Sequence, residues 1–292
     1  MNFQSKPYRV FSGANQTFLV LLSVLCVLPF IHLLAVSLSA EGPSAANEVG
    51  LWPVGFNWDA YRTSFRDANI LRALLVSAER VALGVTLNML ITILVAFPLS
   101  REAKQFPGRT AYVWFFIVTM LFGPGLIPGY ILIKELGLFS SIWALILPST
   151  VPVFNILILM NFFRQLPKEL EEAAFIDGAN YVKTLIRVIL PLSLPSLATL
   201  VLFCTIGHWN AWFDGMIYMK DTAMYPLQTY LRILIDKSSA AISMDDALRN
   251  MQISRRSLVS SQIIISILPI LFIYPFLQKY IKDGLVLGSV KG

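Results

Sequence analysis

The sequence predicts an all-α integral membrane protein with six transmembrane helices. Of its 292 residues, 56% are apolar and only 14% are charged, and the mean hydropathy is +0.68. A soluble protein carries about 25% charged residues, whereas a membrane span needs about 20 mostly apolar residues. The apolar runs predict one membrane domain over residues 17–280, preceded by a cytoplasmic N-terminus (1–16) and followed by a cytoplasmic tail (281–292).

The first three spans follow from the apolar runs and the charges beside them. Thr17 to Ser39 is too long for the apolar core of a signal peptide, about 7–15 residues, so we expect it to be retained. The second span covers Val81 to Leu99, with an outer helical extension from Leu71 to Arg80. The third, Thr110 to Ile133, is broken by glycines and prolines at Gly123 to Gly129. The break is either an unwound stretch beside a cavity or a packing kink.

The other three spans set the topology. They cover Ile142 to Phe163, Leu192 to Phe213, and Val259 to Tyr280. Six spans place both termini on one side, and the short segments on that side are the more positive, so we expect both termini in the cytoplasm. Two long segments, 40–70 and 219–258, then lie outside, and one substantial segment, 164–190, lies inside.

The inner segment 164–190 predicts two short helices joined at a glycine. Pro167 suits the first helical position, and three acids follow it where the positive end of a helix favours them. Gly178 takes the left-handed conformation that ends a helix. A second helix is expected to begin at Ala179-Asn180 and to end at Pro191. From these residues alone, a hairpin lying on lipid headgroups is as good an interpretation as a docking element.

The same segment resembles the EAA loop of ABC importer permeases. The matching residues are Glu172-Ala173-Ala174, Gly178, and, after nine residues, Val188-x-Leu190-Pro191, where Val188 stands for the usual isoleucine. The flanks resemble the carbohydrate-uptake branch, and are similar to the second maltose-transport permease and to complex-oligosaccharide importer permeases. These flanking motifs are Phe106-Pro107-Gly108-Arg109, Trp209-Asn210-Ala211-Trp212, Tyr225-Pro226-Leu227-Gln228, and the tail Gly288-Ser289-Val290-Lys291-Gly292.

The resemblance implies the type I ABC importer permease fold with a cytoplasmic coupling helix, in a subunit without catalytic residues. In that family the coupling helix enters a cleft of a separate ATPase subunit. The residues that match it here are Glu172, Ala173, Ala174, Asp177, Gly178, Leu190 and Pro191. The sequence lacks a Gly-x-x-x-x-Gly-Lys-Ser/Thr phosphate loop, so we expect ATP and Mg on the partner ATPase and no cofactor or metal on this chain.

The resemblance also implies the partners and the location. We expect a second permease subunit of different sequence, an ATPase dimer, an extracytoplasmic solute-binding protein, an oligosaccharide substrate and the lipid of a bacterial inner membrane. The basic residues are scattered singly, which argues against nucleic acid as a partner. Cys26 and Cys204 show no metal-ligand spacing and are expected to be buried thiols.

Polar residues within the spans are candidates for the substrate path, because leaving them in lipid is costly. Aromatic rings stack on sugars while amides and carboxylates bind hydroxyl groups, which favours the cluster from His208 to Asp214. The candidate set is Asn155, His208, Trp209, Asn210, Trp212 and Asp214. The segment from His208 to Asp214 is equally well interpreted as a helix end whose tryptophans lie at the membrane interface. Asn155 is equally well interpreted as a hydrogen-bond partner of a neighbouring helix. Glu79-Arg80 is either an interfacial ion pair or a contact for the solute-binding protein.

Other functions remain open on the residues alone. An ion-driven secondary transporter needs a buried acid near mid-membrane, and the spans offer only Asp214, near an end. An ABC permease for a solute that is not a sugar is a further alternative. A membrane-embedded enzyme is disfavoured, because no nucleophile or metal set converges with His208 and Asp214.

Overall fold

A computed structural model describes residues 6–240 and 255–289, and every regular element within those ranges is a helix. The chain divides into two units. Unit 1 comprises Met1–Ala68 and Leu231–Ile267, and unit 2 comprises Asn69–Tyr230 and Leu268–Gly292. The middle of the predicted outer segment 219–258, residues 241–254, lies outside the described residues, as do the two ends of the chain at 1–5 and 290–292.

Unit 1 is built around one long apolar helix. Its elements are α1 (Lys6–Ser37), α2 (Glu41–Ala45), α3 (Asp59–Arg66) and the first part of α16 (Arg255–Ser289). Serine hydroxyls join α16 to the others, since Ser257 donates to the Val36 carbonyl across 2.9 Å and Ser261 bonds to Ser64 across 2.8 Å. Most side chains of α1 are exposed, as a lipid-facing helix requires. For this reason the expected burial of Cys26 is wrong.

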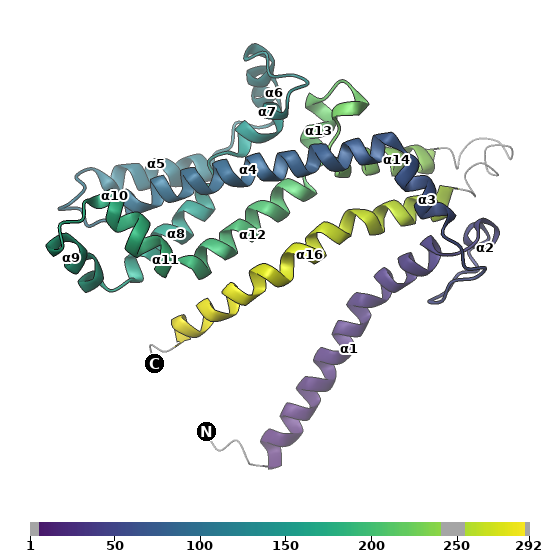
Figure 1. Ribbon diagram of the computed structural model, residues 1–292, viewed down its shortest axis with the longest axis horizontal. Coiled ribbons are helices and arrows are strands. Elements are labelled where there is room, and N and C mark those ends of the chain that lie inside the picture. Colours follow the sequence, from purple (N-terminus) through teal and green to yellow (C-terminus); the bar gives the residue numbers. More distant parts are fainter. Residues whose placement is uncertain (1–5, 241–254, 290–292) are drawn as a thin grey trace. The chain divides into compact units, whose positions relative to one another are not determined.

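Figure 1 labels the remaining α-helices. Unit 2 holds them together with the second part of α16, except that most of α14 belongs to unit 1. Its α-helices are α4 (Ala68–Ser100), α5 (Arg109–Leu121), α6 (Leu126–Glu135), α7 (Ile142–Ile146), α8 (Val153–Gln165), α9 (Lys168–Ile176), α10 (Tyr181–Thr184), α11 (Leu190–Leu192), α12 (Leu194–Asn210), α13 (Phe213–Tyr218) and the start of α14 (Leu227–Ala240). Three short turns of other helix types are η1 (Leu147–Ser149), the π-helix η2 (Leu185–Ile189) and η3 (Thr222–Met224).

Between Ala73 and Ala96, the buried face of α4 consists of small and polar residues, whereas large apolar side chains point outward. Its buried positions recur every three or four residues, the spacing of one helical face. They include Ala73, Ser77, Arg80, Gly84, Asn88, Thr92 and Ala96. The outward side chains include Leu75, Leu90 and Leu94. This arrangement suits a helix in lipid, where small residues permit close helix packing and polar ones bond across it.

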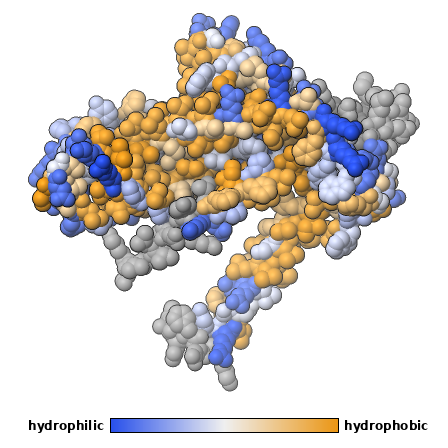
Figure 2. Space-filling view, viewed as in Figure 1, coloured by the Kyte–Doolittle hydropathy of each residue, from blue (hydrophilic) through white to orange (hydrophobic). Residues whose placement is uncertain are grey.

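The apolar core of unit 2 lies where α4 ends. Leu99 of α4 packs there with Leu159 and Phe163 of α8, Ile189 of η2 and Leu200 of α12. This core therefore anchors the segment that follows α9 to three membrane-type helices. Figure 2 shows hydrophilic side chains gathered at the end of unit 2 that carries α9 and α10.

Three of the predicted spans are single long helices, and three are bent pairs. The single apolar helices run over Tyr8–Ser37, Ala68–Ser100 and Arg256–Phe276. The bent pairs are α5 with α6 at 106°, α7–η1 with α8 at 48°, and the helix Tyr181–Leu192 with α12 at 82°. By length and composition, residues 6–240 and 255–289 thus contain up to six spans. The predicted break in the third span is thus confirmed, and the fourth span is bent where a continuous helix was expected. The predicted fifth span corresponds to the single helix α12 of the third pair, and the bend at Ser193 lies at its start. At the sharpest break, Gly125 has a φ of 81°, which glycine adopts without strain.

Candidate functional site

The segment between α8 and α12 forms the predicted helix pair. Helix α9 ends with Gly178 at φ 79°. The Gly178 N–H donates to the Phe175 carbonyl and the Ala179 N–H to the Ala174 carbonyl, at 3.0 and 2.9 Å. These two bonds are the Schellman motif, which satisfies the carbonyls left free at a helix end. The prediction that Gly178 makes the turn is therefore confirmed.

The predicted ends of the two helices need small corrections. Pro167 is the N-cap of α9 and not its first residue, and Asn180 is the N-cap of α10, where its side chain accepts from the Lys183 N–H at 2.9 Å. Pro191 does not end the second helix, which continues to Leu192. The π-helix η2 precedes Pro191 and shifts the hydrogen-bond register, and the bend follows at Ser193.

Helix α9 has an attached face and a free face. Glu171, Ala174 and Phe175 are partly buried, whereas Glu172 and Ala173 are exposed. The attached residues are spaced i, i+3, i+4, so they lie on one side of the helix. The free face continues to the tip, where Ile176 is 86% exposed and Asp177 and Gly178 are exposed as well. Leu190 and Pro191 lie at the far end of the second arm, away from this tip.

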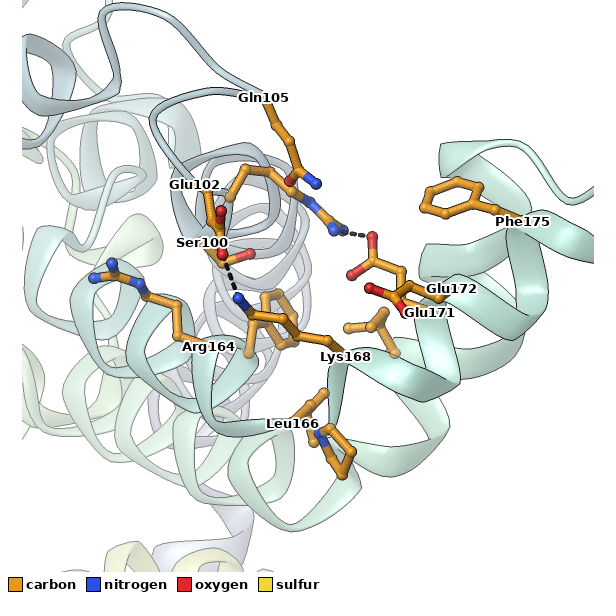
Figure 3. A pocket seen from close by; sticks show the side chains of 13 residues that line it. Ser100, Glu102, Gln105, Arg164, Leu166, Lys168, Glu171, Glu172 and Phe175 are labelled. Atoms are coloured by element: carbon orange, nitrogen blue, oxygen red, sulfur yellow. Dashed lines mark hydrogen bonds and ion pairs between the residues drawn. The ribbon is translucent and has the colours of Figure 1, made fainter.

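A cleft of about 290 Å³ separates α9 from the ends of α4 and α8 (Figure 3). Two ion pairs cross it, Arg101 with Glu171 and Lys168 with Glu102. The second pair is open to solvent. Its hydrogen bond and charge attraction lower the pKa of Glu102 and raise the pKa of Lys168.

A second cavity of about 430 Å³ lies among α4, α7, α8, α12 and α13. Its lining is mostly apolar, and we call it the polar cavity after the charged and amide side chains that also line it. Its polar lining includes Arg80 and Asn88 of α4, Asn155 of α8, His208 of α12 and Asp214 of α13. Three of the six predicted path residues, Asn155, His208 and Asp214, are thus brought together.

Arg80 connects three helices beside this cavity. Its guanidinium pairs with both carboxylate oxygens of Asp214, one of them at 3.1 Å. It also donates to the Leu145 carbonyl at 3.2 Å and to the Ala211 carbonyl at 3.4 Å. The interpretation of Glu79-Arg80 as an ion pair is therefore wrong, because Glu79 is exposed and Arg80 is engaged elsewhere.

His208 is held by a short hydrogen-bond chain. The Asn88 amide nitrogen donates to the Ser149 carbonyl at 2.7 Å, which turns the Asn88 oxygen toward His208. The Nε2–H of His208 donates to that oxygen across 2.6 Å. Gly84 makes room for the ring, since a β-carbon at position 84 would lie 2.5–2.8 Å from three ring atoms.

The other predicted path residues do not line this cavity. Trp209 is buried, Trp212 is half-buried and Asn210 is exposed. Prediction from sequence left Arg80 out of the path, and it counted Asn88 among the polar residues of the spans without including it in the final set. A signal for both was present, because they lie on the small and polar face of α4 together with Gly84. Asn155 also donates to the Cys204 sulfur of α12 at 3.2 Å, so its helix-bonding role holds too.

Comparison with known proteins identifies the family. A family model described as "Binding-protein-dependent transport system inner membrane component" matches residues 77–286. The match covers more than half of the chain. The chain belongs to this family.

Two relatives of this inner-membrane component match it over nearly the whole length of both chains. It is 38% identical to the "Polygalacturonan/rhamnogalacturonan transport system permease protein YtcP" of Bacillus subtilis (strain 168), over 97% of this chain and 99% of that protein. It is also 38% identical to "Protein LplC" of the same organism, over 99% and 97% of the two chains.

Among solved structures, the inner-membrane component matches a chain of a bacterial ABC transporter involved in the import of the acidic polysaccharide alginate. The TM-score is 0.83 at 28% identity, and the match covers 96% of this chain and 99% of that chain. The family and this likeness confirm the type I ABC importer permease fold expected from the sequence.

Proposed function

We propose that this chain is the permease subunit of a binding-protein-dependent ABC importer. It forms part of the translocation path for an oligosaccharide and couples that path to ATP hydrolysis on a separate subunit. The family match supports the importer class. A saccharide substrate is supported by the names of a relative, a polygalacturonan/rhamnogalacturonan transport permease, and of a structural neighbour involved in alginate import.

The observation that carries the coupling role is the free face of α9. Ile176 is an apolar side chain 86% exposed at the tip of a short helix outside the apolar core. Beside it, Ala173 permits close backbone approach and Glu172 offers a charged acceptor. An exposed apolar side chain ringed by small and polar residues fits insertion into a partner protein. We assign Glu172, Ala173, Asp177 and Gly178 to that contact.

The remaining members of the EAA set support the contact from behind. Ala174 is partly buried on the attached face, next to the Schellman turn. Leu190 packs against the core of unit 2, and Pro191 continues that arm toward α12. A push on the free face of α9 would thus reach α12 through a helical arm that is already docked on the core.

The partner set follows from this role. The chain works with a second permease subunit, a dimer of ATPase subunits that hold ATP and Mg, and an extracytoplasmic solute-binding protein. It spans the bacterial inner membrane several times, with both termini in the cytoplasm so that α9 faces the ATPase.

The polar cavity is the proposed part of the saccharide path on this chain. Its amides and carboxylate match the hydrogen-bonding needs of hydroxyl groups, and it lies among apolar helices that suit a membrane. Arg80 is paired with Asp214, the His208 Nε2–H bonds to Asn88, and the Asn155 amide nitrogen bonds to Cys204. The polar atoms that would face a sugar are therefore mainly the Asn155 amide oxygen and the other ring nitrogen of His208.

The test is a reconstituted complex of this chain with its second permease, ATPase subunits and solute-binding protein in proteoliposomes. Oligogalacturonates, alginate oligosaccharides and maltodextrins are compared for stimulation of ATP hydrolysis and for uptake. The proposal expects at least one of them to stimulate both. Uptake driven by an ion gradient without ATP would indicate a secondary transporter, and stimulation only by solutes other than sugars would remove the saccharide assignment.

A further inference from the structure

Arg101 occupies the junction between a membrane-type helix and the docking hairpin. It directly follows α4, whose last residue is Ser100. Its side chain is only 10% exposed, and its partner Glu171 on α9 is 18% exposed. An arginine is rarely buried to this extent unless it is paired, so the position of Arg101 depends on its ion pair with Glu171.

Arg101 also contacts the second arm of the hairpin. Its guanidinium lies 4.2 Å from the centre of the Phe97 ring of α4 and 5.7 Å from that of Tyr181, the first residue of α10. Tyr181 in turn meets the Phe175 ring of α9 edge-on at 5.1 Å. A cation above a ring face is held by the electrostatic attraction of the ring. One side chain thus joins α4, α9 and α10.

The neighbouring ion pair provides a contrast. Lys168 and Glu102 also join α9 to the α4–α5 loop, but their side chains are 70% and 56% exposed. Water screens such a pair, so it adds little to stability. Both pairs are drawn in Figure 3, where the two dashed lines cross the same cleft.

We propose that Arg101 is the positioning residue that transmits movement of the hairpin to α4. This inference rests on the proposed function, because it concerns how the ATPase-docking helix reaches the spans. Glu171 lies on the attached face of α9, whereas Glu172 and Ile176 lie on the free face. Arg101 and Glu171 therefore fix the hairpin to the path through side chains that are nearly buried. Glu172 lines the same cleft but is exposed, and it belongs to the surface that would bind the ATPase.

This separation gives the two faces different mutant phenotypes. Loss of the Arg101–Glu171 pair should leave the ATPase bound while substrate no longer controls its activity. Coupling between two sites typically changes the affinity at one of them by a factor of about 5 to 150. We therefore expect the rates of transport and of substrate-stimulated ATP hydrolysis to decrease by a factor of about 5 to 150. Basal hydrolysis and co-purification of the ATPase should remain near wild type.

The experiment uses the full reconstituted complex and whichever of oligogalacturonates, alginate oligosaccharides or maltodextrins stimulates the wild type most. The variants are Glu171→Gln, which keeps the side-chain volume, Arg101→Lys, which keeps the charge but loses the planar stack, and the charge exchange Arg101→Glu with Glu171→Arg. The matched control is Glu102→Gln with Lys168→Gln. The readouts are ATP hydrolysed per sugar transported and the amount of ATPase that co-purifies.

Glu171→Gln should raise the number of ATP molecules hydrolysed per sugar transported, with the ATPase still bound. Arg101→Lys should retain part of the coupling, because it keeps the charge. In the control, the ATP hydrolysed per sugar should change by less than about twofold. Wild-type stoichiometry in Glu171→Gln, or loss of bound ATPase in it, would overturn the proposal. If the charge exchange recovers part of the coupling that Arg101→Glu and Glu171→Arg each lose alone, the ion pair is supported. No recovery counts against it. A wild-type complex that no sugar stimulates would instead contradict the proposed function itself.

Discussion

Arg80 of α4 and Asp214 of α13 form a largely buried ion pair between positions 134 residues apart. The arginine side chain is 2% exposed and the aspartate 26%. The two terminal guanidinium nitrogens each donate to one carboxylate oxygen, which is the bidentate geometry that gives Arg–carboxylate pairs their strength. The pair closes one side of the polar cavity and also tethers the Leu145 carbonyl. Its loss should therefore affect both the stability of unit 2 and the shape of the cavity.

Asp214→Leu should destabilise the chain by about 3–5 kcal/mol, because it leaves a buried arginine without its partner. Arg80→Leu should also destabilise it, while the double variant should be less damaged than the sum of the two. Thermal unfolding of the purified complex measures all three. Additive effects in the double variant would show that the two side chains do not stabilise each other.

Gly84→Ala should displace the His208 ring, because the new methyl group would lie 2.5–2.8 Å from it. Overpacking of this kind costs about 1–3 kcal/mol. Gly207→Ala is the matched control on α12, since a β-carbon there would have no heavy atom of the described residues within 4 Å. Alanine is the better helix former by about 1 kcal/mol, so the control should be neutral or stabilising. Equal melting temperatures for the two variants would refute this packing.

Gly178→Asp should abolish transport while the chain still inserts into the membrane. The left-handed backbone strains a residue with a β-carbon by roughly 1–2 kcal/mol, and somewhat less for aspartate. A β-carbon at this position meets none of the described residues within 4 Å. The damage should therefore arise at the exposed tip, where the new side chain would stand between α9 and a partner. Gly137→Asp, at φ 66°, introduces similar strain outside the hairpin and should keep uptake. Wild-type uptake in Gly178→Asp would reject the docking role of the tip.

Glu172→Ala should weaken binding of the ATPase subunit about tenfold, because one lost charge-assisted hydrogen bond costs about 1.5 kcal/mol or more. Co-purification at graded salt and binding to immobilised complex measure the effect. Glu135→Ala removes an equally exposed acid at the end of α6 and should leave ATPase binding unchanged. If both variants retain the ATPase alike, Glu172 has no contact with it.

The features that could be predicted from sequence are the local ones. Gly178 makes its turn because only a few backbone geometries follow a helix end, and the apolar runs locate α1, α4 and α16 through their length alone. The end of the second helix was predicted at Pro191, but the helix continues to Leu192 and bends at Ser193. The π-helix before Pro191 changes the hydrogen-bond register there, and the sequence does not indicate that change. Local pattern also does not tell a broken span from a straight one when the break, as in α7–α8, carries few glycines.

Pairings across the chain were beyond local pattern. Nothing near Arg80 indicates that its partner is Asp214 and not the adjacent Glu79, because the choice depends on how α4 and α13 pack. In the same way, Glu171 and Glu172 are alike in sequence, and only the packing of α9 places one against Arg101 and leaves the other exposed.

The most direct test of whether α9 docks on the ATPase subunit is photo-cross-linking from position 176 in native membranes. A photoreactive amino acid is placed at position 176 and, as a control, at Phe122, an exposed apolar residue at the break between α5 and α6. If α9 docks on the ATPase, position 176 should cross-link to the ATPase subunit and position 122 should not. Cross-linking of position 176 to lipid alone would contradict the docking role, because α9 would then be a hairpin on the membrane surface.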